Sequence, residues 1–243
     1  MATFLRPLSY KYQGLYDTIS RLGALSVGGE RRFRNLALQG LNINQDTVVL
    51  DMCCGSGQTT QFLVKDSQQV TGLDISPLSL KRAAQNVPQA KYVEANAEDM
   101  PFPDNHFDLV HTSVALHEMT WGELQEIITE VYRVIKPGGI FAFIDLHKPT
   151  NPLFWPGLAI FMWLFETHTA WKLIETDLIA ELEKVGFIET KKTLHAGGSL
   201  QVIQGIKNQP TFLINTLTYP NVNNSLDSFF TRPNNFDKHT QHL

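Results

Sequence analysis

The sequence predicts an α/β fold built on a doubly wound, mostly parallel sheet of seven strands that ends in an antiparallel hairpin. One observation behind this prediction is that short apolar segments alternate with amphipathic segments between residues 48 and 186. Another is that the last two apolar segments flank "HAGGS", residues 195–199, which is a plausible hairpin turn. Because parallel strands place their carboxyl ends at one edge of a sheet, a ligand is expected beyond that edge.

Seven apolar runs bounded by turn residues predict the strands. They are expected at residues 48–52, 70–73, around 92, 107–112, 140–144, 187–194 and 200–206. A first helix is expected from about residue 58 to residue 65. Ser76 and Pro77 are residue types favoured at the N-cap and the first position of a helix, so a second helix is predicted from Pro77 towards Asn86.

Two more helices are predicted from apolar residues that recur at helical spacing. The first apolar stripe consists of Leu124, Ile127, Ile128, Val131 and Ile135. "KPGG", residues 136–139, should stop that helix, because proline and glycine do not easily continue it. The second stripe consists of Ile174, Leu178, Leu182 and Val185, and its helix is expected to end at Gly186.

The composition favours one main domain without a nucleic-acid surface. The 243 residues are 43% hydrophobic and carry a formal charge of −4, which suits one substantial core. No long basic block is present, which argues against binding by counterion release. A leader with an apolar run and a small-residue cleavage site is also missing, so the protein is expected to be cytoplasmic.

Three regions are expected along the chain. Residues 1–40 are predicted to form an N-terminal helical lid, residues 41–207 the ligand-binding domain, and residues 208–243 a flexible tail. The apolar insertion at residues 150–170 is too short to cross a bilayer, which takes ~20 apolar residues. It is expected to cover a hydrophobic acceptor, with burial between layers as the alternative. A lipophilic acceptor taken from a bilayer would make the protein membrane-peripheral.

A turn with two glycines joins the first strand to the first helix in "VVLDMCCGSGQTT", residues 48–60. Gly55 and Gly57 let the backbone approach a ligand closely, and the N-terminus of the next helix favours an anionic group. Asp74, at the end of the second strand, can accept hydrogen bonds from both hydroxyls of a ribose. These features favour an adenosine-containing ligand. The alternatives are a tight turn that requires glycine for its own geometry and an acid that caps the next helix.

Four segments in this order carry a resemblance to a known family: "VLDMCCGSG", "GLDIS", "EANAEDMPFPDNHFDLV" and "VYRVIKPGG". The sequence resembles the class I S-adenosylmethionine-dependent methyltransferases, and within them the methyltransferases of ubiquinone and menaquinone biosynthesis. The resemblance covers roughly residues 10–190. It implies a Rossmann-like fold, S-adenosyl-L-methionine as the cofactor, and methyl transfer to a small, lipophilic or aromatic quinol-like acceptor.

The resemblance also implies a set of cofactor-binding residues. Asp51, Gly55, Gly57 and Thr60 are expected around the methionine part, and Asp74 is expected at the ribose. Asn96 and Ala97 are expected at the adenine with Glu98 beside them, and Ser113 lines the channel to the sulfur. Ile75 is a further candidate for cofactor binding. The adjacent Cys53 and Cys54 are interpreted as compact wall residues rather than reagents. They lack the CxxC spacing of a zinc or redox pair, so no metal is expected.

The acceptor side departs from the quinone-pathway pattern. Those enzymes usually have a "GLRNVT"-like stretch, and here His117 and Glu118 replace its Arg-Asn. His117 is the candidate general base, since a histidine titrates near working pH; otherwise it positions the substrate or packs as a neutral ring. Tyr16 and Trp155 are the other candidate substrate-binding residues. His111, inside a predicted strand, is interpreted as structural.

Two other functions are alternatives to methyl transfer. An NAD(P)-dependent reductase would need a third glycine where Thr60 stands, and a Tyr-xxx-Lys pair that the chain lacks in a suitable place. A non-catalytic binding module on the same fold is the alternative from a different class. The intact glycine turn and Asp74 argue against it, whereas the altered segment at residues 113–121 leaves room for it.

Overall fold

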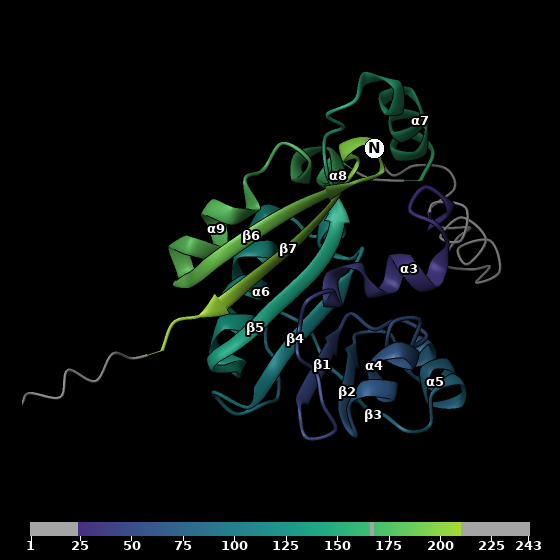
Figure 1. Ribbon diagram of the computed structural model, residues 1–243. Coiled ribbons are helices and arrows are strands. Elements are labelled where there is room, and N and C mark those ends of the chain that lie inside the picture. The colour runs from purple at the N-terminus through teal and green to yellow at the C-terminus, as the bar shows by residue number, and fades with distance from the viewer. Residues whose placement is uncertain (1–23, 166–167, 210–243) are drawn as a thin grey trace, which may run out of the picture. The chain divides into compact units, whose positions relative to one another are not determined.

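A seven-stranded sheet forms the centre of the computed structural model, which describes residues 24–165 and 168–209 (Figure 1). The strand order is β3-β2-β1-β4-β5-β7-β6. The strands are β1 (Val48–Met52), β2 (Gln69–Asp74), β3 (Lys91–Glu94), β4 (Phe107–Ser113), β5 (Ile135–Leu146), β6 (Phe187–His195) and β7 (Leu200–Lys207). Strands β1 to β5 pair in parallel, and β7 runs antiparallel to both β5 and β6. The predicted fold class, including the C-terminal antiparallel hairpin, is confirmed.

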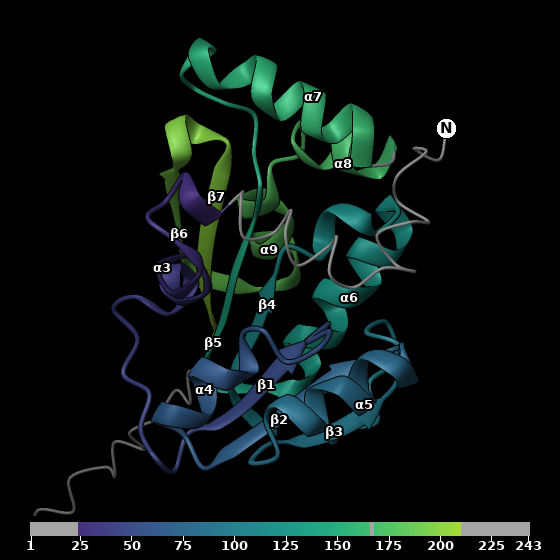
Figure 2. The ribbon, with the colours of Figure 1, turned by 90° about the vertical axis from the view of Figure 1, so that its right-hand side faces the viewer.

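Helices cover both faces of this sheet (Figure 2). The described α-helices are α3 (Glu30–Asn35), α4 (Thr60–Asp66), α5 (Pro77–Asn86), α6 (Trp121–Val134), α7 (Trp155–Phe165), α8 (His168–Leu173) and α9 (Leu178–Val185). Short 3-10 helices are η1 (Leu36–Leu38), η2 (Leu116–Glu118), η3 (Pro152–Phe154) and η4 (Ala196–Gly198). One apolar core joins α6 and α9 to the sheet, and a second core lies under α3, η1 and α4.

Local signals set the ends of several helices, and those at Ser76-Pro77 and at Gly186 are the ones that the sequence predicts. The Ser76 side chain accepts a hydrogen bond from the Ser79 amide at 3.2 Å, and Pro77 is the first residue of α5. Helix α6 starts in a capping box, in which Thr120 and Glu123 each bond the backbone amide of the other. Gly186 ends α9 in the left-handed region, with φ of 117°.

Two boundaries differ from the sequence-based expectation. Strand β5 begins at Ile135 rather than near residue 140, because Ile135 already pairs with Phe107 of β4 before the register shifts. Ile135 is therefore the start of a strand and not the last residue of the apolar stripe of α6. Ile174 follows α8, and α9 begins only after Asp177, whose carboxylate caps the Ile179 amide. In both cases tertiary pairing or a cap interrupts a pattern that continues in the sequence.

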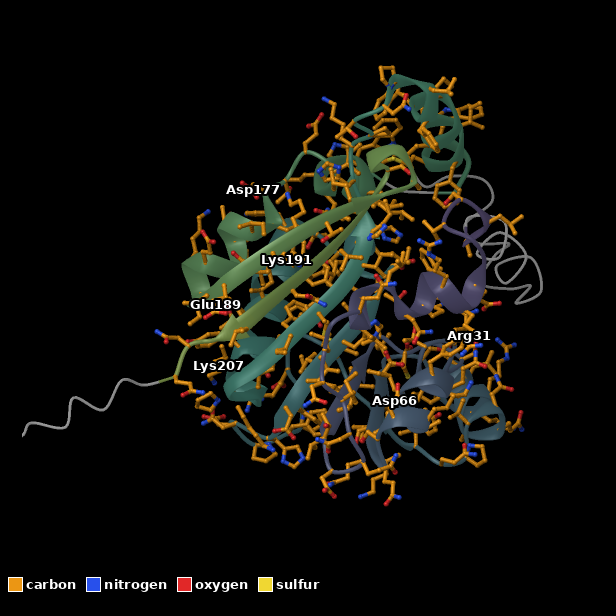
Figure 3. All side chains as sticks on the ribbon, in the orientation of Figure 1. Arg31, Asp66, Asp177, Glu189, Lys191 and Lys207 are labelled. Atoms are coloured by element: carbon orange, nitrogen blue, oxygen red, sulfur yellow. The ribbon has the colours of Figure 1, made fainter. Side chains whose placement is uncertain are left out.

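Lys207, labelled in Figure 3, is the last residue of β7. Its side chain caps the carboxyl end of α6. Its Nζ donates hydrogen bonds to the carbonyl oxygen of Tyr132 at 2.6 Å and to that of Ile135 at 2.9 Å. The last carbonyls of a helix have no partner within the helix, and a cation there also interacts favourably with the helix dipole. This contact joins the last described strand to the helix on the α6 side of the sheet.

The turn between β6 and β7 holds the chain that leads to α7. Gly197 accepts hydrogen bonds from the backbone amides of Thr150 at 3.1 Å and Asn151 at 2.9 Å. Gly197 and Gly198 both have positive φ. A Cβ atom on Gly197 would collide with the ring of Phe154, so glycine is required there for close approach as well as for conformation.

The region boundaries predicted from sequence are only partly within the described residues. Of the N-terminal 40 residues, the structure describes 24–40, where α3 and η1 pack over the sheet. Most of the expected tail lies outside the described residues. The apolar insertion forms η3, α7 and the start of α8. Among the helices of the described ranges, none combines the length and the apolar character that crossing a membrane requires.

Candidate active site

A cavity of about 410 Å³ lies at the carboxyl ends of β1, β2, β3 and β4, where the sequence places the ligand. Of the residues predicted to bind the cofactor, those in its wall are Asp51, Gly55, Asp74, Ile75, Asn96, Ala97, Glu98 and Ser113. Wall residues that sequence reasoning did not name include Arg34, Gln58, Arg82 and Met119. Four separate strand ends thus contribute to one concave site, as is usual for open α/β sheets.

Asp74 is fixed in place by two backbone amides. One of its carboxylate oxygens, Oδ2, accepts a hydrogen bond from the Gly55 amide at 2.8 Å, and Oδ1 accepts one from the Ser76 amide at 2.9 Å. A carboxylate has about four acceptor sites, so each oxygen keeps a further lone pair for a ligand. The acid therefore stabilises the glycine turn, and it is also oriented to accept hydroxyl groups from a ligand in the cavity.

Glycine is needed at the two positions of the turn for different structural reasons. Gly55 has φ of 55°, and a Cβ built on it meets no atom within 4 Å, so this side of the turn is open. Gly57 has φ of 83°, and its Cβ would lie 3.2 Å from Val87 at the end of α5. Gly55 thus keeps the cavity clear, whereas Gly57 lets the turn pack against a neighbouring helix and does not belong to the cavity wall.

Asp51 joins a buried polar chain behind the glycine turn. Its side chain accepts hydrogen bonds from Thr60 Oγ1 at 2.6 Å and from His111 Nδ1 at 3.0 Å, the latter implying that the ring proton is on Nδ1. All three residues are at most 1% exposed. Thr60 therefore acts on the site through its hydrogen bond to Asp51 and is not part of the cavity wall. His111 has the structural position predicted for it.

The two cysteines occupy the cavity wall as protonated thiols. Burial raises the pKa of both thiols well above the usual range, and the carboxylate charges of Asp74 for Cys53 and of Asp51 for Cys54 raise it further. A thiol reacts as its thiolate, so neither sulfur is activated. Cys53 also has φ of 56°, in the left-handed region that favours glycine.

The thiols are expected to react slowly in the folded protein. At pH 8, alkylation by iodoacetamide should be at least tenfold slower in the native protein than in urea, where a free cysteine has a pKa near ~8.5. The rate can be followed by mass spectrometry of intact protein. Equal rates in the two states would show that burial and the neighbouring carboxylates do not suppress the thiolate.

Arg34 brings a cation into the cavity wall from α3, and sequence reasoning missed it. Its side chain is 4% exposed, and its guanidinium donates to Ser113 Oγ at 3.2 Å and to Gln58 Oε1 at 2.5 Å. These two acceptors belong to the end of β4 and to the glycine turn. A buried guanidinium oriented in this way is suited to a carboxylate or another anion in the cavity.

His117 is held by Asp145, an acid near the end of β5. His117 Nδ1 lies 2.7 Å from Asp145 Oδ1, and the ring is 3% exposed. Asp145 is fully buried and also accepts hydrogen bonds from the amides of Leu116, His117 and Leu146. The pairing assigns the proton of a neutral ring to Nδ1, so Nε2 is the basic nitrogen.

The predicted acceptor-side residues do not all meet in the cavity wall. The wall includes Glu118 and Met119, on one side of His117, and Ser113 to Ala115, on the other, but His117 is set back from it. Trp155 is 36% exposed at the start of α7, where its ring packs edge-to-face on Trp171. Tyr16 lies outside the described residues. Within the described residues, the cavity wall therefore contains most of those predicted to bind the cofactor but none of those predicted to bind the acceptor.

The family follows from comparison with known proteins. A family model described as a methyltransferase domain matches residues 49–139. A Synechocystis protein (strain PCC 6803) named uncharacterized methyltransferase sll0829 is 58% identical over 209 residues, which cover 86% of this chain and 99% of the relative. The chain belongs to the class I S-adenosylmethionine-dependent methyltransferases. The resemblance inferred from the sequence motifs is thereby confirmed.

Two further relatives of this methyltransferase are named for quinone substrates. Demethylmenaquinone methyltransferase of Lactiplantibacillus plantarum is 34% identical, over 64% of this chain and 70% of the relative. 2-Phytyl-1,4-naphtoquinone methyltransferase of Nostoc (strain PCC 7120) is 31% identical, over 63% of this chain and 69% of the relative. Phosphoethanolamine N-methyltransferase 2 of Haemonchus contortus, solved with S-adenosyl-L-methionine, shares the fold with a TM-score of 0.54 and 16% identity, over 74% of this chain and 52% of that one.

The cavity wall of this methyltransferase fits S-adenosyl-L-methionine, its cofactor. Within the described residues, the wall has an excess of acidic side chains, since it is lined by Asp51, Asp74, Glu98, Glu118 and Glu123 but by only two basic residues, Arg34 and Arg82. An acidic site favours a sulfonium cation. Gly55 leaves the turn open, and Asp74 has acceptor sites for hydroxyls. No group of three metal-ligating His, Cys, Asp or Glu side chains is found in the described part of the chain.

Proposed function

We propose that this methyltransferase methylates a quinol-type aromatic ring that carries an apolar tail. The observation that carries the proposal is the similarity to two quinone methyltransferases, which extends over about two thirds of the chain. The apolar helix α7 follows β5 at the cavity end of the sheet and suits an acceptor with a hydrocarbon tail. The change from Arg-Asn to His117 and Glu118 counts against an acceptor identical to those of the quinone-pathway enzymes, more than against the reaction itself.

We assign the cofactor contacts by the chemistry of the wall residues. Asp74 would accept the ribose hydroxyls, and Asn96 to Glu98 would flank the adenine beside Ile75. Arg34 would pair with the carboxylate of the methionine part, close to Gly55 and Ser113. The buried chain formed by Asp51, Thr60 and His111 supports the turn from behind. Asp51 is also in the cavity wall and would bind the cofactor directly, like Asp74 and Arg34, whereas Thr60 and His111 would hold Asp51 in place.

The protein's remaining task is to orient the acceptor, exclude water and take a proton. When bound, S-adenosyl-L-methionine supplies a methyl group that is already activated towards nucleophiles. We assign His117 as the group that accepts the proton of a ring hydroxyl at Nε2, because Asp145 fixes the opposite nitrogen as a donor. Loss of that proton makes the ring a better nucleophile. Glu118 in the cavity wall would orient the hydroxyl towards the ring of His117.

The acceptor proposal can be tested by transfer of a labelled methyl group. Purified enzyme, tritiated S-adenosyl-L-methionine and a demethyl naphthoquinol with a short alkyl tail should give tritium in an organic extract. The matching oxidised quinone has no ring hydroxyl to lose and should remain unlabelled. Binding of the cofactor without labelling of any quinol would reject this acceptor class. It would also favour the non-catalytic binding module if other acceptor classes stayed unlabelled.

Asp74→Ala should weaken cofactor binding roughly 30-fold, because hydrogen bonds to a charged group contribute about 1.5–3 kcal/mol. Isothermal titration with S-adenosyl-L-methionine measures this change directly. Asp99→Ala removes an exposed acid nearby and should leave the dissociation constant within about twofold. The effect should also exceed that of His117→Ala on the same constant, and the reverse order would contradict the assignments.

A further inference from the structure

Helix α7 exposes apolar side chains to solvent on one side while it is anchored on the other. Met162 is fully buried in the core under α3 and η1. By contrast, Trp163 is 73% exposed and Ile160 is 59% exposed. Leu153, in the turn before the helix, is 82% exposed. We call Leu153, Ile160 and Trp163 the apolar face.

Exposure of this face to water is unfavourable, and α7 is too short to span a membrane. An exposed surface of this kind marks a contact with a lipid or protein partner, because burying apolar area is worth about 25 cal/mol per Å². The sequence of α7, "WPGLAIFMWLF", contains no polar residue, so solvent contact is not offset by a polar stripe. Its 11 residues would extend about 16 Å, roughly half of a bilayer core. A helix of this length can lie in the interface of a bilayer but cannot cross it.

Charge and aromatic residues favour a lipid surface as the partner. No Asp or Glu occurs in the sequence between Asp145 and Glu166, and Lys148 is exposed in this stretch. Lysine near an apolar helix is attracted to anionic headgroups. Trp155 and Trp163 stand near the two ends of α7, and tryptophan prefers the level of the headgroups.

The apolar face lies at the same end of the sheet as the cavity. In Figures 1 and 2, α7 and α8 both lie beyond the carboxyl ends of the parallel strands. Helix α8 packs on η2, the short helix that ends in the cavity residue Glu118. A molecule entering from beside α7 would therefore reach the acceptor side of the cavity first. The arrangement suits an acceptor whose tail stays in the bilayer.

We propose that α7 and the preceding turn dock on an anionic bilayer surface, with Leu153, Ile160 and Trp163 inserted at the headgroup level. Docking presents the cavity to a membrane-held acceptor, a part of the inference that rests on the proposed function. The docking itself depends only on the apolar face, the tryptophans of α7 and the exposed Lys148. The two can therefore fail separately.

Sedimentation of the full chain with vesicles tests the docking. With phosphatidylcholine and phosphatidylglycerol at 3:1, the wild-type protein should sediment with the vesicles. The double variant Leu153→Gln, Trp163→Gln should show at least a tenfold lower partition coefficient. Ile188→Gln is the matched control, because Ile188 is a 40% exposed apolar residue on β6 and its loss should change partitioning less than twofold. Retained binding of S-adenosyl-L-methionine would show that the double variant is folded.

Several results would overturn the docking proposal. They are a wild-type protein that stays in the supernatant, a double variant that sediments like the wild type, and a control that loses binding equally. Conversion of a dimer to a monomer by the double variant, without vesicle binding by the wild type, would make a second copy of the chain the partner. Docking with no labelled quinol would reject the proposed acceptor and leave the docking intact.

Discussion

Replacing Asp145 with alanine is expected to lower the free energy of unfolding by about 3–5 kcal/mol. The carboxylate is fully buried and accepts hydrogen bonds from three backbone amides and from His117. Its removal leaves these donors without an acceptor in a site that water does not reach, and each unsatisfied group costs about 1–3 kcal/mol. Urea unfolding followed by circular dichroism measures the change, provided that the slope with denaturant stays constant.

A surface acid provides the comparison for this substitution. Asp104 pairs with Arg133 at 2.8 Å, but its side chain is 70% exposed. Asp104→Ala should therefore cost less than about 1 kcal/mol. If both substitutions had the same small effect, Asp145 would not be the buried acceptor that joins η2 to β5. The structural account of the acceptor side would then be wrong.

His117→Gln is expected to lower kcat about 100-fold, near the lower end of what a positioned general base contributes. Only the neutral ring can accept a proton, so the wild-type rate should rise with pH over an acid limb. Glutamine can hold a hydrogen bond to Asp145 but cannot act as a base, so the acid limb should disappear in the variant. The pH profile of kcat, measured with a quinol that the wild type methylates, gives both results.

Binding measurements separate this role from a structural one. The dissociation constant of S-adenosyl-L-methionine should change less than about twofold in His117→Gln, since His117 is not in the cavity wall. His106, an exposed histidine before β4, supplies the control His106→Gln, which should behave like the wild type. A variant that keeps the acid limb and instead shows a raised KM and lower stability would assign His117 to packing or substrate positioning.

Much of the fold follows from local patterns because the deciding interactions are local. Ser76 and Pro77 start α5 through contacts within one turn, and Gly186 ends α9 through its own backbone conformation. The start of β5 could not be read in the same way. Ile135 continues the helical spacing of α6, and only its pairing with Phe107 of β4 makes it part of a strand. Non-local pairing outweighs a local pattern at that point.

The residues of the candidate site show the same difference between local patterns and long-range contacts. Asp74 and Gly55 belong to motifs whose spacing is visible in the sequence, and both line the cavity. Arg34 and Asp145 have no such spacing. Arg34 reaches Ser113 across 79 positions of the chain, and Asp145 reaches His117 across 28. The one available signal was the presence of a single acid, Asp145, within the apolar run of the fifth strand, since a buried acid needs a partner.

The resemblance to known enzymes helped most where single residues carry little information. Asn96 and Ala97 have no distinctive chemistry, yet the family motif placed them after the third strand, where they enter the cavity wall. The motif was less informative about Thr60 and Gly57. Thr60 supports Asp51, and Gly57 packs against α5, so the same motif includes supporting residues as well as wall residues.

The close approach of Gly197 to Phe154 lets the turn between β6 and β7 influence how α7 is placed. A residue larger than glycine at this turn would collide with the Phe154 ring, so the segment that leads into α7 would have to shift. Every group assigned to methyl transfer would remain in place. Delivery of fat-soluble molecules could thus diverge between related enzymes through substitutions more than 30 positions downstream of that helix, with the chemistry itself conserved.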